Sequence, residues 1–103
     1  MTPELLTPIF FEATERRKVC RIRLKSETDW RVIYPFGICM NPRKKIMLVA
    51  WQESGYASKS PVPGYRNFNL MEIEEVETTD RRFIQNKDFN PDDSQYSDWV
   101  YHI

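Results

Sequence analysis

The run from Ile46 to Trp51 constrains the fold of this chain more than any other stretch. It is the longest unbroken series of apolar residues, Ile-Met-Leu-Val-Ala-Trp, in a sequence of 103 residues. A short run of aliphatic and β-branched residues is typical of a strand that is buried on both faces. We therefore predict a central strand from Lys45 to Gln52, against which the rest of the chain packs.

A strand is also predicted over residues 17–25, where apolar and polar positions alternate. The apolar positions are Cys20, Ile22 and Leu24. The opposite face carries the cations Arg21, Arg23 and Lys25. This row of positive charge is either a solvated face or a stripe that binds an anion, and the sequence leaves both alternatives open.

The next strand is predicted from Trp30 to Phe36, after a polar turn at 26–29. The short connection makes it antiparallel to the strand before it. Pro35 cannot donate a hydrogen bond to a neighbouring strand, so the strand ends there, lies at an edge or contains a bulge. We expect residues 38–40 to continue the pairing beyond a bend at Gly37.

On either side of the central strand the sequence predicts loops, and two more strands follow it. A turn is expected at 41–44. The segment 53–64 is rich in Ser, Gly, Pro and Lys, so we expect a mobile loop on the surface. Residues 65–70 and 72–77 are predicted strands, and the polar residues 78–80 are predicted to form a turn or a helix cap.

Helical signals are confined to the two ends of the chain. Thr2-Pro3 and Thr7-Pro8 each place a capping threonine before a proline, and the second pair is preferred as the start of a helix over residues 8–16. At the other end, the aromatic residues within 96–103 predict a short closing helix or a segment that docks on the core.

Five short strands with helices only at the ends predict a mainly β fold, a small, strongly bent antiparallel barrel of five strands. A chain of this length has room for one core, so we expect a single domain over residues 1–103. Within it, residues 1–16 are the predicted N-terminal helix region, 17–83 the barrel and 84–103 a docked C-terminal extension.

Charge is distributed unevenly, although the net formal charge is zero. Residues 1–45 contain ten Lys and Arg against five Asp and Glu, whereas residues 46–103 contain five against ten. This split favours a surface that faces an anion on one side of the fold. The alternative, in which the two halves neutralise each other across the fold, fits the sequence equally well.

The sequence offers little for catalysis or metal binding. Cys20 and Cys39 lack the spacing of metal ligands, so we expect buried thiols in a reducing compartment, with no metal and no cofactor. His102 is the only histidine, and no serine or cysteine has a base beside it in the sequence, so we expect no enzymatic activity. No leader pattern is present and no apolar run approaches the ~20 residues of a membrane span, so we expect a cytoplasmic protein without a membrane partner.

The order of these signals resembles the WYL domain family. The resemblance covers residues 9–83 and rests on the stretches RVIYPFGI (31–38), IMLVA (46–50), YRNFNLMEI (65–73) and TDRRF (79–83). It implies a bacterial, SH3-type, Sm-like β-barrel that usually follows a DNA-binding region. The residues before the predicted helix are too few for such a region, so a partner chain or a longer parent protein would supply it.

The resemblance also implies a non-catalytic, ligand-sensing domain. Such a domain binds nucleic acid, a nucleotide or another anion, and regulates transcription through a DNA-binding or effector protein. Arg31 and Arg66 match positions of the family. The name-giving Trp-Tyr-Leu falls on Ile46-Met47-Leu48, where only the leucine is retained, and the second arginine of the family's Arg-Ile pair falls on Glu72.

The candidate ligand contacts are cations and aromatic rings. The cations, whose planar guanidinium groups suit a phosphate or a carboxylate, are Arg31, Arg66, Arg21 and Arg23. The rings on which bases would stack are Tyr34 and Tyr65. Trp51 could also stack, with a place in the core as the alternative. For Arg31 and Arg66 the alternative is an ion pair with a local acid such as Glu72 or Glu74.

A different class of function is left open. The chain could be a protein-protein interaction or homo-oligomerisation module, for example a homodimer, that binds neither a small ligand nor nucleic acid. The zero net charge, the non-aromatic Ile46 and Met47, and the exposed strand edges of a small barrel favour it. Phosphate binding would weaken steeply with salt, whereas burial of apolar surface between chains would not.

Overall fold

The computed structural model describes residues 1–57 and 61–103. Within these residues the chain forms one α-helix, six strands and one short 3-10 helix. In chain order they are α1 (Pro3–Glu15), β1 (Lys18–Leu24), β2 (Arg31–Met40), β3 (Ile46–Gly55), β4 (Gly64–Asn69), η1 (Leu70–Glu72), β5 (Ile73–Arg82) and β6 (Asp98–His102). The predicted mobile loop at 53–64 includes residues 58–60, which lie outside the described residues, and β3 contains its first three residues.

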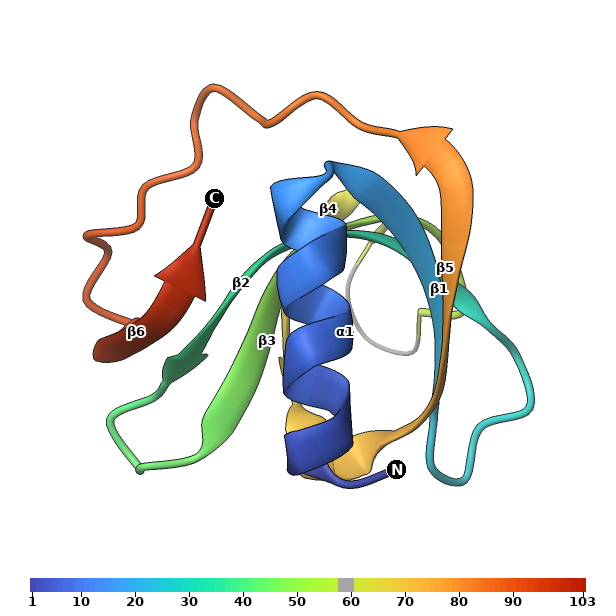
Figure 1. Cartoon of the computed structure of the whole chain (residues 1–103), viewed down its shortest axis with the longest axis horizontal. Helices are drawn as coiled ribbons and strands as arrows, with labels where there is room; N and C mark the ends of the chain where they lie inside the picture. Colours follow the sequence, from blue (N-terminus) through green and yellow to red (C-terminus); the bar gives the residue numbers. More distant parts are fainter. Residues whose placement is uncertain (58–60) are drawn as a thin grey trace.

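All six strands belong to one antiparallel sheet, which curves around α1 (Figure 1). The order along the sheet is β4-β3-β2-β1-β5. β1 pairs with β2 at residues 31–33, and β6 pairs with β2 at residues 37–40. The predicted mainly β, antiparallel fold is confirmed. A closed barrel of five strands is not confirmed, because the sheet is open between β4 and β5 in the described residues and contains a sixth strand.

The apolar run that begins at Ile46 forms β3, between β2 and β4. Its consecutive residues Leu48, Val49 and Ala50 are all fully buried, so both faces of the strand are covered. The prediction of a central strand that is buried on both faces is confirmed.

β2 is paired on both sides and contains a bulge at Pro35. Pro35 pairs with Ala50, and Gly37 pairs with Val49, so Phe36 is an extra residue in β2. A proline has no N–H to donate, and a bulge is one of the places where a sheet tolerates it. Of the alternatives that the sequence left open at this proline, the structure contains the bulge.

The helix starts earlier than the sequence predicted. α1 begins at Pro3, where the Thr2 hydroxyl accepts a hydrogen bond from the Leu5 N–H, and Pro8 lies inside the helix. The preferred start at Pro8 is therefore wrong. The longer helix buries Leu6 completely. Burial of a leucine is worth about 1.5–3 kcal/mol, which offsets much of the ~3 kcal/mol cost of an interior proline.

The sheet carries a core on each face. On one face α1 packs its buried residues onto the sheet; these residues are Leu6, Phe10, Ala13 and Thr14. On the other face Phe36 and Val49 are covered by the chain that follows β5, from Phe83 through Phe89. In Figure 1 this segment runs from β5 over the top of the molecule to β6.

Two predictions for the C-terminal half need correction. The predicted turn or cap at 78–80 lies within β5, where the Thr79 hydroxyl donates to the Val19 carbonyl across a bulge. The predicted closing helix is a strand, β6, although the alternative of a docked segment is confirmed. Exposure alternates along β6, where Trp99 and Tyr101 are half-buried and their neighbours exposed, so its period is two rather than 3.6. Trp99 packs against the core opposite to α1, and Tyr101 packs against the core that α1 covers.

Gly37 makes the docking of β6 possible. A Cβ atom at this position would lie 2.5 Å from the Tyr101 carbonyl oxygen and 2.8 Å from the His102 Cα. We expect Gly37→Ala to lower the free energy of unfolding by about 1–3 kcal/mol, the cost of overpacking, and to displace β6. Urea unfolding measures the first effect, and amide exchange of residues 98–102 the second. Unchanged protection of these amides would contradict the close approach.

Candidate functional site

The row of cations on β1 is paired with acids on β5. Arg21 lies 3.2 Å from Glu77, and Arg23 lies 3.2 Å from Glu75, each in an ion pair between directly opposed residues. The Arg21 guanidinium also lies over the Trp30 ring, 4.6 Å from its centroid. At these positions the basic N-terminal half and the acidic C-terminal half neutralise each other. Two of the three cations in the row are therefore held in a ladder of ion pairs.

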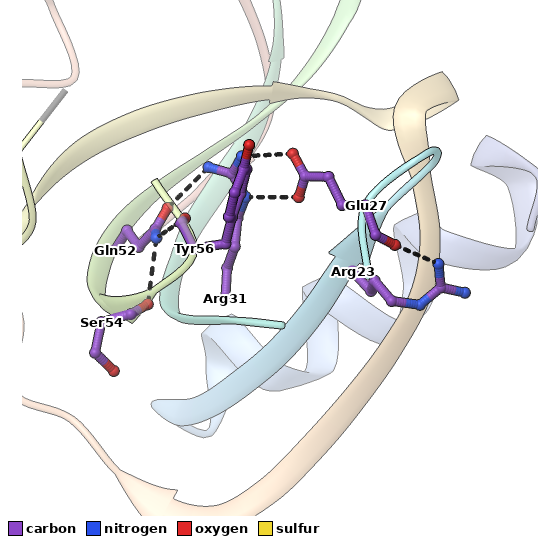
Figure 2. Close-up of polar contacts among 6 residues, drawn as sticks. All are labelled: Arg23, Glu27, Arg31, Gln52, Ser54 and Tyr56. Carbon is purple, nitrogen blue, oxygen red and sulfur yellow. Dashed lines mark hydrogen bonds and ion pairs between the residues drawn. The ribbon is translucent and has the colours of Figure 1, made fainter. Parts of the chain in front are cut away.

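Arg31 lies at the centre of a nearly buried polar cluster, which Figure 2 shows. Its side chain is 8% exposed and that of Glu27 is 18% exposed. Nε and Nη2 of Arg31 donate to the two carboxylate oxygens of Glu27, at 3.2 and 2.8 Å. Nη1 donates to the side-chain oxygen of the fully buried Gln52, at 3.2 Å. The guanidinium is therefore satisfied by two partners in the protein.

The Arg31 cluster ties together two loops. Glu27 belongs to the β1–β2 turn, and its carbonyl accepts a hydrogen bond from Arg23. The side-chain amide nitrogen of Gln52 donates hydrogen bonds to the carbonyls of Ser54 and Tyr56, at the end of β3 (Figure 2). Because a bidentate pair fixes both position and orientation, Arg31 sets the geometry of both loops. The predicted local acid pair exists, but with Glu27 rather than with Glu72 or Glu74.

The predicted aromatic ligand contacts come together on the face opposite to α1. Tyr34 on β2 is directly opposed to Trp51 on β3, and Trp51 is directly opposed to Tyr65 on β4. We call these three residues the aromatic row. All three rings are half-buried and pack against the core on that face. The rings of Trp51 and Tyr65 meet edge to face at 4.9 Å.

One end of the aromatic row is held by Glu53 and Arg81. The Tyr34 hydroxyl donates to Glu53 at 2.7 Å, and Arg81 donates to both oxygens of the same carboxylate, at 2.8 and 3.0 Å. The Tyr34 ring stacks on Phe83 at 4.9 Å. The hydrogen bonds from Arg81 and Tyr34 lower the pKa of Glu53, while burial and the bond to Glu53 raise the pKa of Tyr34.

The other end of the row is Tyr65, whose hydroxyl donates to Asp88 at 2.6 Å. Burial, followed by this bond, raises the pKa of Tyr65 to about 12. The neighbouring Arg66 donates to the carbonyls of Tyr65 and Pro61. Arg66 is directly opposed to Ala50 of the core that α1 covers, so its side chain leaves β4 on the face opposite to the aromatic row, and only its guanidinium returns to the Tyr65 carbonyl at the edge of the sheet.

Sequence reasoning missed Glu53, Arg81 and Phe83 as parts of this surface. Glu53 lies two residues beyond Trp51, so the period of a strand places both on one face. That signal is present in the sequence, but the Ser, Gly and Pro residues that follow predict a loop from Glu53 onward. Arg81 could not be placed, because its contact with Glu53 depends on how β5 curves around the sheet.

Cys20 and Cys39 are buried free thiols, and burial raises the pKa of Cys20 to about 11. In residues 1–57 and 61–103 no group of three His, Cys, Asp or Glu side chains is arranged to hold a metal ion. No helix in the same part of the chain is long and apolar enough to cross a membrane.

Comparisons of this chain with models of known protein families, with curated proteins and with solved structures found no match. The resemblance to the WYL domain therefore stays a prediction that rests on the short motifs alone.

Proposed function

We propose that this chain is a non-catalytic binding domain of the SH3-type, Sm-like class, resembling the WYL domain, and that it senses nucleic acid or a nucleotide. The order of strands supports this class, because β1 to β4 follow one another as a meander and a 3-10 helix leads into β5 beside β1. The resemblance extends the proposal to a cytoplasmic bacterial regulator that acts on a DNA-binding or effector protein.

The aromatic row is the observation that carries the proposal. Three half-buried rings on adjacent strands, Tyr34, Trp51 and Tyr65, form a surface across the sheet. Bases stack on such rings whatever their identity, with about 1–3 kcal/mol per stacked base. Single-stranded nucleic acid exposes the faces of its bases, so it is the ligand that suits this surface best.

A cation at each end of the row would hold the phosphates. Arg66 leaves β4 on the face opposite to Tyr65, but its guanidinium donates to the Tyr65 carbonyl at the edge of the sheet, where a bound strand would reach it. Arg81 lies beside Tyr34 with 59% of its side chain exposed. We assign phosphate contacts to these two residues. Arg81 also pairs with an acid, Glu53, which a phosphate would have to displace. Arg31, whose side chain is 8% exposed, and Arg21 and Arg23, which pair with acids of β5, are assigned a structural role.

The test is fluorescence polarisation of labelled single-stranded DNA and RNA at low and moderate salt. We expect salt-sensitive binding, weakened about tenfold by Trp51→Leu through the loss of one stacked base. Arg66→Gln is expected to make the plot of log binding constant against log salt concentration less steep by about 0.7, the slope that one phosphate of a single strand contributes.

Two exposed residues of α1 provide matched controls. Arg16→Gln removes a cation whose side chain is 65% exposed, and Phe11→Leu removes an exposed ring. Both lie on the helix, away from the aromatic row, and should bind oligonucleotides as the unchanged chain does. No binding at low salt, or equal losses in Arg16→Gln and Arg66→Gln, would reject the proposal.

A second candidate, a protein-interaction or homo-oligomerisation module, is favoured by the ion-pair ladder between β1 and β5. That ladder removes the positive surface on which phosphate recognition would draw. Exposed apolar side chains are also present on α1 and η1, where Leu5 is 58% and Met71 55% exposed. A dimer in light scattering, together with no oligonucleotide binding in the same sample, would favour this candidate.

A further inference from the structure

A small cavity lies between β4 and the segment that crosses the sheet after β5. Its volume is about 110 Å³. Three aromatic rings line it, those of Tyr65, Phe89 and Tyr96. Two carboxylates, Asp88 and Asp93, also line it, and the remaining lining side chains are neutral amides. Among the residues that the structure describes, no Lys or Arg side chain lines the cavity.

The rings are arranged around one another as a partial cage. The centroid of Phe89 lies 6.2 Å from that of Tyr65 and 6.1 Å from that of Tyr96, with interplanar angles of 34° and 48°. The face of an aromatic ring carries negative charge density and attracts a cation within about 6 Å of its centroid. Cages of this kind recognise ammonium groups in preference to neutral groups of the same shape.

The two carboxylates add full negative charge to the same place. Neither Asp88 nor Asp93 forms an ion pair with a described residue. Lys87 is the nearest cation in the sequence, and it is exposed and does not line the cavity. After burial, the negative charge of Asp93 contributes to the raised pKa of Tyr96, and Asp88 contributes to that of Tyr65. A field that opposes ionisation of two tyrosines favours a bound cation.

The lining is held in place before any ligand arrives. Asp93 accepts a hydrogen bond from the Gln95 N–H at 3.0 Å, and Gln95 in turn accepts one from Asn67 of β4 at 2.8 Å. The Trp99 indole donates to the Pro91 carbonyl at 2.8 Å. These bonds anchor the segment 88–96 to the sheet, so little conformational entropy is lost when a ligand binds.

We propose that this cavity binds an organic ammonium or guanidinium group. It is far smaller than the ~300–1,000 Å³ of sites for drug-sized ligands, so it would take one head group. The group belongs either to a Lys or Arg side chain of a partner protein or to a free small cation. The cavity shares Tyr65 with the aromatic row, but the proposal is tested without nucleic acid, so it can fail or hold whatever the outcome for oligonucleotide binding.

The test is a titration of the ¹⁵N-labelled full chain, followed by amide chemical shifts at neutral pH. The probes are the N-acetyl methylamides of lysine, trimethyllysine and arginine, with tetramethylammonium as the free cation and the norleucine derivative as the neutral control. We expect saturable shifts at residues 65 and 88–96 with the cations only. Tighter binding of the amino-acid probes than of tetramethylammonium would identify a protein side chain as the source, and the reverse order a free cation.

Three variants separate the site from general attraction. Asp93→Asn keeps the side-chain oxygen that holds Gln95, and we expect it to weaken cation binding about tenfold. Asp92→Asn removes the same charge one residue away, outside the lining, and should change binding by less than about twofold because solvent screens it. Tyr96→Leu keeps apolar bulk but removes a ring, and should also weaken binding.

Three results would overturn the proposal. The first is an equal response to the neutral norleucine probe. The second is an equal effect of Asp92→Asn and Asp93→Asn. The third is the absence of saturable shifts with every cation. The ¹⁵N–¹H signal of the Trp99 indole, which donates to the Pro91 carbonyl, shows for each variant whether the segment remains docked, so a loss of binding is not confused with a loss of structure.

Discussion

Arg31→Ala is expected to lower the free energy of unfolding by about 3 kcal/mol or more. The substitution leaves the Glu27 carboxylate, which is 18% exposed, and the fully buried Gln52 amide without their common donor. An unpaired charge of this kind is costly, because its desolvation is no longer compensated. Urea unfolding of the variant and of the unchanged chain measures the difference.

The ion pair between Arg21 and Glu77 provides the control. Its side chains are 39% and 55% exposed, so Arg21→Ala should cost about 1 kcal/mol or less. The double variant Arg31→Met, Glu27→Gln removes both charges and should recover part of the loss. A cost for Arg31→Ala as small as that for Arg21→Ala would mean that Glu27 turns to solvent and that the cluster does not fix the loops.

Phe36→Ala is expected to lower the free energy of unfolding by a similar amount, about 3–5 kcal/mol. Phe36 is the extra residue of the β2 bulge and is fully buried. Its ring lies 5.0 Å from Phe89, 5.8 Å from Phe83 and 6.1 Å from Tyr65. The cost combines lost burial with the cavity that remains. Amide exchange should also show that the segment after β5 opens more often, because its anchor is gone.

Phe11→Ala is the matched control for this prediction. Phe11 is 45% exposed and contacts Tyr101 edge to face at 5.0 Å, so its loss should cost about 1 kcal/mol. Equal costs for Phe36→Ala and Phe11→Ala would contradict the assignment of a second core. Unchanged exchange of the amides of Phe83 and Phe89 would show that the segment is held elsewhere.

Local signals were sufficient for most of the strands. The alternation of Cys20, Ile22 and Leu24 identified β1, the apolar run identified β3, and Pro35 required an edge, an end or a bulge in β2. These inferences succeed because the period of two and the missing N–H of proline act within a few residues.

Predictions from local sequence signals were wrong where contacts with distant parts of the chain outweighed a local preference. Local signals favoured Thr7-Pro8 over Thr2-Pro3 as the helix start, but burial of Leu6 on the sheet selects the longer helix. The polar residues 78–80 suit a turn, yet pairing with β1 keeps them in β5. The apolar residues at the C-terminus have a helical spacing. They nevertheless form a strand, because residues 37–40 of β2 lie beyond the part that pairs with β1 and are available to pair with β6.

For the candidate site, too, part could be predicted from the sequence and part could not. The residue types were predictable, because arginines, tyrosines and an apolar strand are visible in the sequence. Their partners were not, since each guanidinium of Arg21, Arg23 and Arg31 could meet either an acid of the chain or a ligand. Coulomb attraction depends on the distance between groups, and the distances were fixed only when the strands aligned.

The sequence by itself determined a mainly β chain with a central buried strand, an irregularity at Pro35 and a helix at the start. Only the tertiary structure decided that Arg31 binds Glu27, that Tyr34, Trp51 and Tyr65 form one row, and that Tyr65 and Tyr96 enclose an acidic cavity with Phe89. Backbone preferences act between neighbours in the chain and can be read from it. Contacts across a sheet depend on register and curvature, which come from the packing of the whole chain.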